Sequence, residues 1–298
     1  MKDLGNAKRI LGMDIYRDRG KGELWLTQKN YLDKLLKRFQ MDNSKPVTIP
    51  LAQQFKLSKD QSPNDEDQRK EMNKIPYASI IGSVMYAMVC TRPDLGHAIS
   101  VVSRFMADPG IEHWHALKWI LRYLKGTTDY GILFRREQGL HGDQLVGFSD
   151  SDYAVSYDTR KSQSGYVFTL YGSTISWRSC LQPVVALSTT EAEYIALAEA
   201  VKESFWLKGV LKDFGIDQKA VEIKCDSASA ICLTKHQTFH VRSKHVDIRL
   251  HFIRDEVNKG SVRVSKVSTD DNASDMLTKA IPSSKLKYCL ELINLIQK

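Results

Sequence analysis

The sequence predicts an α/β protein, with a mixed β-sheet and flanking helices in the second half of the chain after a β-hairpin and a mostly helical region. Residues 9–27 read as two strands joined by a glycine-containing turn. Between residues 76 and 125 apolar side chains recur at helical spacing, and from about residue 130 strand patterns alternate with helical ones. This order indicates strands paired in one mixed sheet with helices packed on it.

The first half is expected to contain the hairpin and four helices. Thr27 is placed to cap a helix that runs to Met41. Residues 42–74 hold three prolines and a long polar run, which predict a linker that crosses the surface. Three helices are expected to follow, over about 76–90, 93–106 and 112–125.

On the helix over 112–125, Lys118, Arg122 and Lys125 share one exposed face beside two tryptophans. Such a basic stripe next to aromatic rings could follow a nucleic-acid backbone. A solvated charged face is the commoner explanation of such charges, so both interpretations stay open.

The second half is expected to hold strands with helices between them. The expected strands are 144–150, which ends on Asp150, the hairpin 165–177, which turns near Gly172, 221–226, which ends on Asp226, and 261–268. A helix capped by Ser188 and Glu191 precedes the second of the aspartate-ended strands. An amphipathic helix is expected over 240–257, and residues 271–281 are expected to begin a last helix.

Glu193 is unusual on its helix because the residues that share its face are Ala196, Leu197 and Ala200. Its carboxylate therefore points toward the core side. A buried charge needs a cation, a metal or a shifted pKa. The alternative is that Glu193 lies at the edge of the apolar face and leans into water.

Two strands that end in aspartate can lie side by side, so that Asp150 and Asp226 emerge at one edge of the sheet. Glu193 and Asp275, each near the start of a helix, can reach the same edge. Such a cluster of hard oxygen ligands suits Mg²⁺ and not zinc. Taken singly, each aspartate could instead cap a helix or turn. A zinc site would have to use Cys225, Cys232, His236 and His240, whose spacing matches no common pattern.

Composition and charge narrow the classes further. The chain of 298 residues is 42% hydrophobic and 26% charged, as in ordinary globular proteins, and its length allows two domains. The net charge of +8 suits a polyanionic partner. Residues 1–143 carry 23 Lys and Arg against 17 Asp and Glu, whereas residues 144–298 carry 20 against 18. The first half is thus better suited to binding phosphates by charge alone.

Cysteine usage and the lack of a leader pattern bear on the compartment. The five cysteines are widely spaced without a CxxC pair, which indicates a reducing compartment. The N-terminus lacks the apolar segment of a signal peptide. The longest uncharged run, residues 75–91, contains a proline and a glycine and is expected to be a buried helix rather than a membrane span.

Seven runs in the second half stand out together: SDSDYA, DTRKSQSGYVF, ISW, ALSTTEAEYIALAEA, CDSASAI, RSKHVDIRLHFIRD and ASDMLTKAI. They resemble the RNase H domain at the end of the Pol polyprotein of copia-type LTR retrotransposons, particularly the plant elements. Upstream, RILGMDI followed by LWLTQKNYLDKLLKRF resembles the last part of their reverse transcriptase, where the LG-containing strand acts as primer grip. The run from YASIIGS to LRYLKGT resembles the thumb and connection region.

The resemblance covers nearly the whole chain and implies three parts. Residues 1–41 would be the end of the reverse-transcriptase palm with its primer-grip hairpin and first thumb helix. Residues 42–129 would be a linker and the helical thumb and connection region, and residues 130–298 an RNase H-like domain. The chain would belong to a larger reverse transcriptase in the cytoplasm, within a virus-like particle, or in the nucleus, with no membrane partner.

The resemblance also implies an activity and a site. Asp150, Glu193, Asp226 and Asp275 match the family's four metal-binding carboxylates. Two Mg²⁺ ions about 4 Å apart, for which Mn²⁺ can substitute, would promote hydrolysis of the RNA strand of an RNA–DNA hybrid. The expected nucleic-acid contacts are Lys118, Arg122, Lys125, Arg160, Lys161, Arg242, His245 and Arg249.

Two departures from the family pattern matter. No histidine occurs between Ser261 and Asp275, where cellular and retroviral RNases H carry a mobile one. No YxDD motif is present, so we expect no DNA polymerase activity from this fragment alone. Two other classes stay open: a non-catalytic nucleic-acid-binding remnant or host-adopted protein, and a DNA-cutting integrase or transposase of the same fold.

Overall fold

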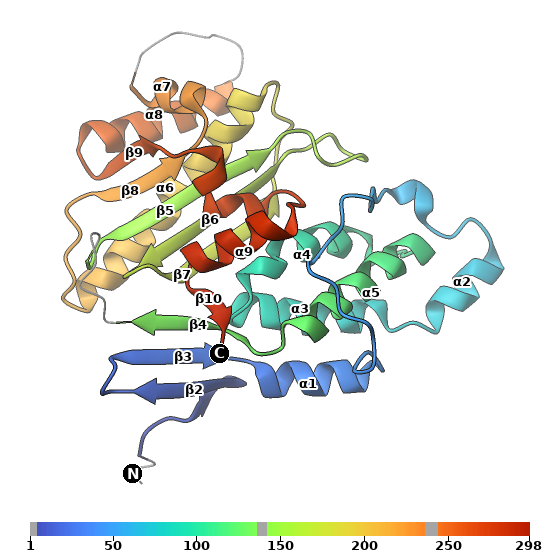
Figure 1. Cartoon of the computed structure of the whole chain (residues 1–298). Helices are drawn as coiled ribbons and strands as arrows, with labels where there is room; N and C mark the ends of the chain where they lie inside the picture. Colours follow the sequence, from blue (N-terminus) through green and yellow to red (C-terminus); the bar gives the residue numbers. More distant parts are fainter. Residues whose placement is uncertain (1–4, 136–141, 236–243) are drawn as a thin grey trace. The chain divides into compact units, whose positions relative to one another are not determined.

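The computed structural model describes residues 5–135, 142–235 and 244–298, with the side chains of 244–250 excepted. The chain divides into two compact units. The first unit is Met1–Arg136 together with Ala280–Lys298, and the second is Glu137–Lys279. Each unit contains one five-stranded sheet (Figure 1).

The sheet of the first unit is antiparallel throughout and has the order β1-β2-β3-β4-β10. Its strands are β1 (Arg9–Ile10), β2 (Met13–Asp18), β3 (Glu23–Thr27), β4 (Tyr130–Arg135) and β10 (Leu295–Gln297). The predicted hairpin over 9–27 is therefore present, as β2 and β3, but it is the centre of a larger sheet. Strands from both ends of the unit's sequence complete that sheet, which local patterns could not show.

The helices of the first unit are α1 (Lys29–Arg38), α2 (Glu66–Asn73), α3 (Tyr77–Cys90), α4 (Gly96–Val102), α5 (Ile111–Gly126) and α9 (Ser283–Leu292). On α5 the predicted apolar stripe is buried, with Leu117, Ile120, Leu121 and Leu124 fully enclosed. The predicted helices over 76–90 and 112–125 are thus confirmed to within a residue or two.

Three local expectations in this unit are corrected. Residues 66–73 form α2 inside the expected linker, because Asp65 caps it by accepting from the Gln68 N–H and Met72 buries its side chain. The Thr27 hydroxyl accepts from the Lys29 N–H at 3.3 Å at the start of α1, but this helix ends at Arg38 and not at Met41. The helix expected over 93–106 is broken into a 3₁₀ turn, the short α4 and a second 3₁₀ turn.

The second unit has a mixed sheet with the order β7-β6-β5-β8-β9. Its strands are β5 (Leu145–Asp152), β6 (Gln163–Leu170), β7 (Ser173–Leu181), β8 (Val221–Cys225) and β9 (Val262–Lys266). The pairs β5/β6 and β6/β7 are antiparallel, whereas β5/β8 and β8/β9 are parallel. This is the mixed sheet with packed helices that the sequence predicts.

The β6–β7 turn shows how the local sequence sets this geometry. Tyr171 and Gly172 both have positive φ, 52° and 72°. Two successive residues with positive φ are typical of the two-residue hairpin turn whose twist matches that of the strands. The turn predicted near Gly172 is confirmed.

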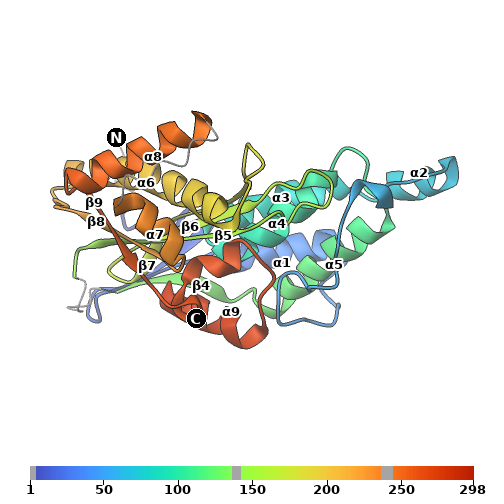
Figure 2. The same cartoon turned by 90° about the horizontal axis from the view of Figure 1, so that it is seen from above.

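Helices α6 (Thr189–Asp213), α7 (Ala228–Lys235) and α8 (Lys244–Asn258) pack on this sheet (Figure 2). Leu197 and Val201 of α6, Phe168 of β6 and Ile223 of β8 have no exposed surface, and they belong to one apolar core. Burial of each such side chain stabilises the fold by roughly 1.5–3 kcal/mol. Helix α6 contacts β5, and a backbone hydrogen bond from Ser151 of β5 to Glu193 places the first turns of α6 near the end of that strand.

The last predicted helix is wrong in form. Residues Ala273–Leu277 make a short 3₁₀ helix, and the separate helix α9 begins at Ser283 after Pro282. A proline cannot continue a helix that precedes it, so the two segments stay apart. Residues from 280 on belong to the first unit, although the resemblance placed them with residues 130–279. The division into two compact units does not show which residues make up each functional part, so the division into three parts stays a prediction.

No helix among the described residues is long and apolar enough to cross a membrane.

Candidate metal centre

The parallel pairing of β5 and β8 places Asp150 and Asp226 next to each other. Ser149 pairs with Cys225 in the register of the two strands. Asp150 and Asp226 are the next residues along each strand, so they lie at the same edge of the sheet, although β5 continues two residues past its predicted end, to Asp152. The side chain of Asp150 is buried, and Asp226 follows the last residue of β8.

Glu193 reaches this edge from the first turns of α6. Ser188 caps the helix by accepting from the Glu191 N–H at 3.1 Å, and the Glu191 carboxylate accepts from the Leu187 N–H at 2.9 Å. Glu191 is thus used by the helix start, as predicted. Glu193 points inward and accepts a backbone hydrogen bond from Ser151 of β5.

Asp275 lies on the 3₁₀ helix that follows β9, and its side chain is fully buried. The amide of Asn272 donates to the carbonyl of Ser149 at 3.1 Å, which holds this segment to β5 beside Asp150.

Gly165 allows the segment that carries Asp275 to approach the sheet. Gly165 pairs with Asp150 in the register of β5 and β6. A Cβ atom at Gly165 would lie 2.8 Å from Leu277 Cβ and 2.8 Å from Thr278 Cγ2. Real Cβ atoms do not come so close, so only glycine fits here.

The four predicted carboxylates therefore converge. Oxygen atoms of Asp150, Asp226 and Asp275 all lie within 4.8 Å of one another. Ligand atoms of Glu193 and Asp226, together with the sulfur of Cys225, form a second group within the same limit. Asp226 joins the two groups into one cluster.

Gln182 holds the elements that carry the cluster. Its buried amide nitrogen donates to Ser164 Oγ at 2.9 Å and to the carbonyl of Ala192 at 2.8 Å, with Ser151 Oγ at 3.3 Å. These contacts connect β5, β6 and the start of α6. Sequence patterns gave no signal for this residue, because its partners are distant in the chain.

Burial and mutual repulsion perturb the cluster. Burial, and then the charges of Asp150 and Asp226, raise the pKa of Glu193 from 4.5 to about 9. Burial also raises the pKa of Asp150 to about 6, against the opposing effect of Lys279. Strongly perturbed pKa values in one cluster are typical of functional sites.

The donor set fits divalent magnesium. All four carboxylates offer hard oxygen atoms, and Glu193 Oε2 is buried without a hydrogen-bond partner among the described residues. The Cys225 thiol is the one soft atom, but burial raises its pKa to about 12, so it stays protonated. Of the residues in the zinc alternative, Cys225 is buried and Cys232 is exposed on α7, while His236 and His240 lie outside the described residues.

Two residues that contact the cluster were not predicted. Thr278 donates its hydroxyl hydrogen to Asp150, and the Lys279 ammonium lies 3.0 Å from Asp275 Oδ1 and 3.4 Å from Asp150 Oδ2. The spacing of four residues between Asp275 and Lys279 was the available signal, because such pairs can meet on a helical turn.

The predicted nucleic-acid contacts have different outcomes. Arg160 and Lys161 lie in the loop between β5 and β6, which leaves β5 at the end where Asp150 lies. In the first unit, Arg122 donates to the carbonyl of Lys45 at 2.7 Å and stacks on Trp119, while Lys118 stacks on Trp114. Two of the three stripe cations thus have contacts within the chain, and both interpretations of the stripe stay open. Arg242 lies outside the described residues, as do the side chains of His245 and Arg249.

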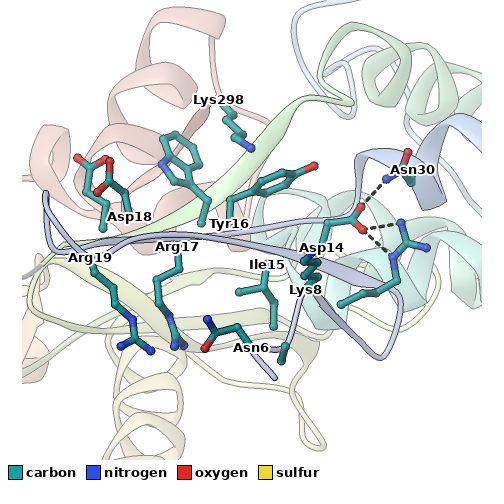
Figure 3. Close-up of a pocket in the computed structure, with 14 residues that line it drawn as sticks. Asn6, Lys8, Asp14, Ile15, Tyr16, Arg17, Asp18, Arg19, Asn30 and Lys298 are labelled. Carbon is teal, nitrogen blue, oxygen red and sulfur yellow. Dashed lines mark hydrogen bonds and ion pairs between the residues drawn. The ribbon is translucent and has the colours of Figure 1, made fainter. Parts of the chain in front are cut away.

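A second candidate site is a hollow of about 940 Å³ in the first unit, along β2 (Figure 3). Arg17 and Arg19 point to the same side of the strand in Figure 3, and both are exposed. Arg9 is held by Asp14 at 2.6 Å, and Asp14 also accepts from Asn30 at 2.8 Å. Cations outnumber carboxylates in its lining, so the hollow suits an anionic partner.

The chain is similar to several curated proteins of transposons. It is 51% identical over 295 residues to the Retrovirus-related Pol polyprotein from transposon TNT 1-94 of Nicotiana tabacum, across 99% of this chain and 22% of that protein. It is 38% identical over 266 residues to the corresponding polyprotein from transposon RE2 of Arabidopsis thaliana, across 89% of this chain and 17% of that protein. The chain thus spans about a fifth of the length of these relatives.

A shorter relative is matched over most of its own length. The uncharacterized mitochondrial protein AtMg00810 of Arabidopsis thaliana is 34% identical over 206 residues, which is 69% of this chain and 80% of that protein. No family model matches the chain.

Solved structures of RNases H also align with part of the chain. LC11-RNase H1 isolated from compost is 18% identical, with a TM-score of 0.36 over 46% of this chain and 93% of that one. The N-terminal RNase H domain of rv2228c from Mycobacterium tuberculosis is 11% identical, with a TM-score of 0.35 over 50% of this chain and 98% of that one.

We predict that Gly165→Ala weakens divalent-ion binding by about tenfold, the effect typical of losing support around a metal ligand. The added methyl group would push the segment of Asp275 away from Asp150. Calorimetric titration of the full chain with Mn²⁺ measures this. Gly209→Ala is the matched control, because a Cβ there meets nothing within 4 Å. Equal Mn²⁺ affinity in both variants would show that the close approach at Gly165 is not needed.

We predict that the chain in a metal chelator becomes less stable as the pH rises from about 4.5 to about 9. Between these values Glu193 binds more protons in the folded than in the unfolded state, so the free energy of unfolding falls with pH. The stabilising contribution is complete below pH 4.5 and is lost as the pH passes about 9. Thermal unfolding at several pH values measures the slope.

In that experiment Glu193→Gln should flatten the pH dependence, since glutamine does not titrate. Thr189→Ala, an exposed change on the same helix that removes no titratable group, is the control that should keep the wild-type slope. A slope that is equal in Glu193→Gln and in the wild type would contradict the assignment of Glu193 as a buried, protonated carboxyl in the metal-free protein.

Proposed function

The chain belongs to the retrovirus-related Pol polyproteins of copia-type retrotransposons, and on this basis we propose that its second unit is an Mg²⁺-dependent ribonuclease H. Its substrate is the RNA strand of an RNA–DNA hybrid, and its reaction is hydrolysis of a phosphodiester bond. The convergence of four carboxylates from four separate segments at one sheet edge carries this proposal.

The convergence is more informative than any one carboxylate. A single aspartate at the end of a strand is often a cap or a turn residue. Four carboxylates within a few ångströms repel one another and are partly buried, which destabilises the fold unless cations are present. A cluster of carboxylates that destabilises the fold is better explained by a role in ion binding than by a structural role alone.

Asp150, Glu193, Asp226 and Asp275 would hold the divalent ions. When bound, such ions supply activation of a water molecule and stabilise the charge on the departing 3′ oxygen. The Thr278 hydroxyl donates to the buried carboxylate of Asp150 and helps to orient it. The Asn272 amide donates to the Ser149 carbonyl and so holds the segment that carries Asp275 to β5. No histidine stands between Ser261 and Asp275, so we assign no proton shuttle from that stretch.

The partner chemistry follows from the surface around the site. Arg160 is exposed on the loop after β5 and Lys161 follows it, so both can meet phosphates near the cluster. The 2′-hydroxyl group distinguishes the RNA strand, and the shape of the hybrid needs no base-specific contact. In the first unit, the exposed Arg17 and Arg19 add a surface for phosphates.

The chain spans only part of its relatives, and we propose that the rest of a reverse transcriptase completes it in the parent polyprotein. Because the YxDD motif is absent from this sequence, we expect no RNA-directed DNA polymerase activity from the chain alone.

We predict that the purified chain with Mg²⁺ cleaves the RNA of an RNA–DNA hybrid, and that Asp226→Asn lowers the rate more than about a hundredfold, or about 2.7 kcal/mol of activation free energy. The lost charge would no longer hold an ion at the cluster. A gel assay with labelled RNA or labelled DNA strands measures cleavage. Asp213→Asn, an exposed change at the end of α6, is the matched control and should keep the wild-type rate.

Several outcomes are decisive in this assay. Wild-type activity in Asp226→Asn would refute the site. Hybrid binding without any cleavage would favour the non-catalytic remnant, and cleavage of duplex DNA would favour a DNA-cutting enzyme of the same fold. Circular dichroism of each variant separates loss of activity from loss of folding.

A further inference from the structure

Lys279 places a positive charge against the carboxylate cluster. Its ammonium nitrogen lies 3.0 Å from Asp275 Oδ1 and 3.4 Å from Asp150 Oδ2. The Asp275 and Asp150 side chains are 0% and 1% exposed, whereas Lys279 is 32% exposed. Of the three side chains, Lys279 is therefore the one that can move toward water without unfolding of the site.

The charge balance gives Lys279 a role in the metal-free protein. One ammonium lies among four carboxylates, and its attraction to Asp150 and Asp275 opposes their repulsion. Contact with two carboxylates favours the charged form of a lysine.

A divalent ion at the same oxygens would be repelled by this ammonium. Two cations within about 4 Å of each other repel strongly where water is partly excluded. Ion binding at Asp150 and Asp275 thus competes with the existing ion pairs of Lys279.

We propose that Lys279 is an internal cation that holds the metal-free cluster together and leaves Asp150 and Asp275 when a divalent ion binds. This inference rests on the proposed metal site and adds a residue that sets its affinity. The four-carbon side chain is flexible and one-third exposed, so it can turn toward solvent while Thr278 keeps its contact with Asp150.

The test compares Mn²⁺ binding by the full wild-type chain with that of Lys279→Met, using the signal of free Mn²⁺ in electron paramagnetic resonance. Lys279→Met keeps an unbranched side chain that is one atom shorter, and it removes the charge. We expect a dissociation constant at least about fivefold lower, because a competing charge contact is lost. In chelator, Lys279→Met should unfold at a lower temperature, since the repulsion is then unopposed.

Two further variants separate charge from shape. Lys279→Arg keeps the charge and should bind Mn²⁺ like the wild type. Lys212→Met removes the same charge from an exposed lysine in the last turn of α6, away from the cluster. Its Mn²⁺ affinity should stay within about twofold of the wild type, because exposed charges interact weakly.

If folded Lys279→Met binds Mn²⁺ as the wild type does, or more weakly, the inference is overturned. The proposed metal site still stands in that case if the wild-type chain binds Mn²⁺ and Asp226→Asn abolishes the binding. Absence of Mn²⁺ binding by the wild-type chain would refute the metal site and the inference together. If Lys279→Met does not fold, weaker Mn²⁺ binding by Lys279→Gln than by the wild type would also overturn the inference.

Discussion

Repulsion among partly buried carboxylates is the constraint on which the second unit depends. Asp150, Glu193, Asp226 and Asp275 lie close together where water is partly excluded, and each negative charge makes ionisation of the others less favourable. The metal-free protein meets this constraint in two ways: Glu193 stays protonated up to a high pH, and an ammonium lies against two of the others. Bound divalent ions would offset the repulsion in a third way. Only bound ions would leave all four carboxylates charged and able to take part in hydrolysis of a phosphodiester.

The fold brings these groups together without flexible loops. The parallel register of β5 and β8 fixes two of them, the first turns of α6 fix the third, and a 3₁₀ helix tied to β5 fixes the fourth. Gly165 lets two of these elements approach closely because it has no side chain. Gln182 connects them through three hydrogen-bond contacts of its amide nitrogen. A site built on regular elements in this way holds its geometry before any ligand arrives.

Much of this arrangement could be predicted from the sequence, because it depends on local patterns. Strand runs that end in aspartate, and a glutamate on the apolar side of a capped helix, predict both the elements and their meeting edge. The contact of Lys279 with Asp275 had a local signal in their spacing of four residues, whereas its contact with Asp150 could not be predicted, because that partner is distant in the sequence. The pairing of β10 with β4 was also missed, because strands more than 150 residues apart in sequence carry no local signal of pairing. The helix α2 was missed because its surface is polar and only Met72 is buried.

The most direct test of the account is a crystal structure of the chain with Mn²⁺, in which anomalous scattering locates the metal. The account predicts anomalous peaks bonded to oxygens of Asp150, Glu193, Asp226 and Asp275, with Mn–O distances of about 2.0–2.3 Å and near-octahedral surroundings. The account would be contradicted if crystals soaked in saturating Mn²⁺ showed no anomalous peak at the four carboxylates, or showed peaks only at other surfaces.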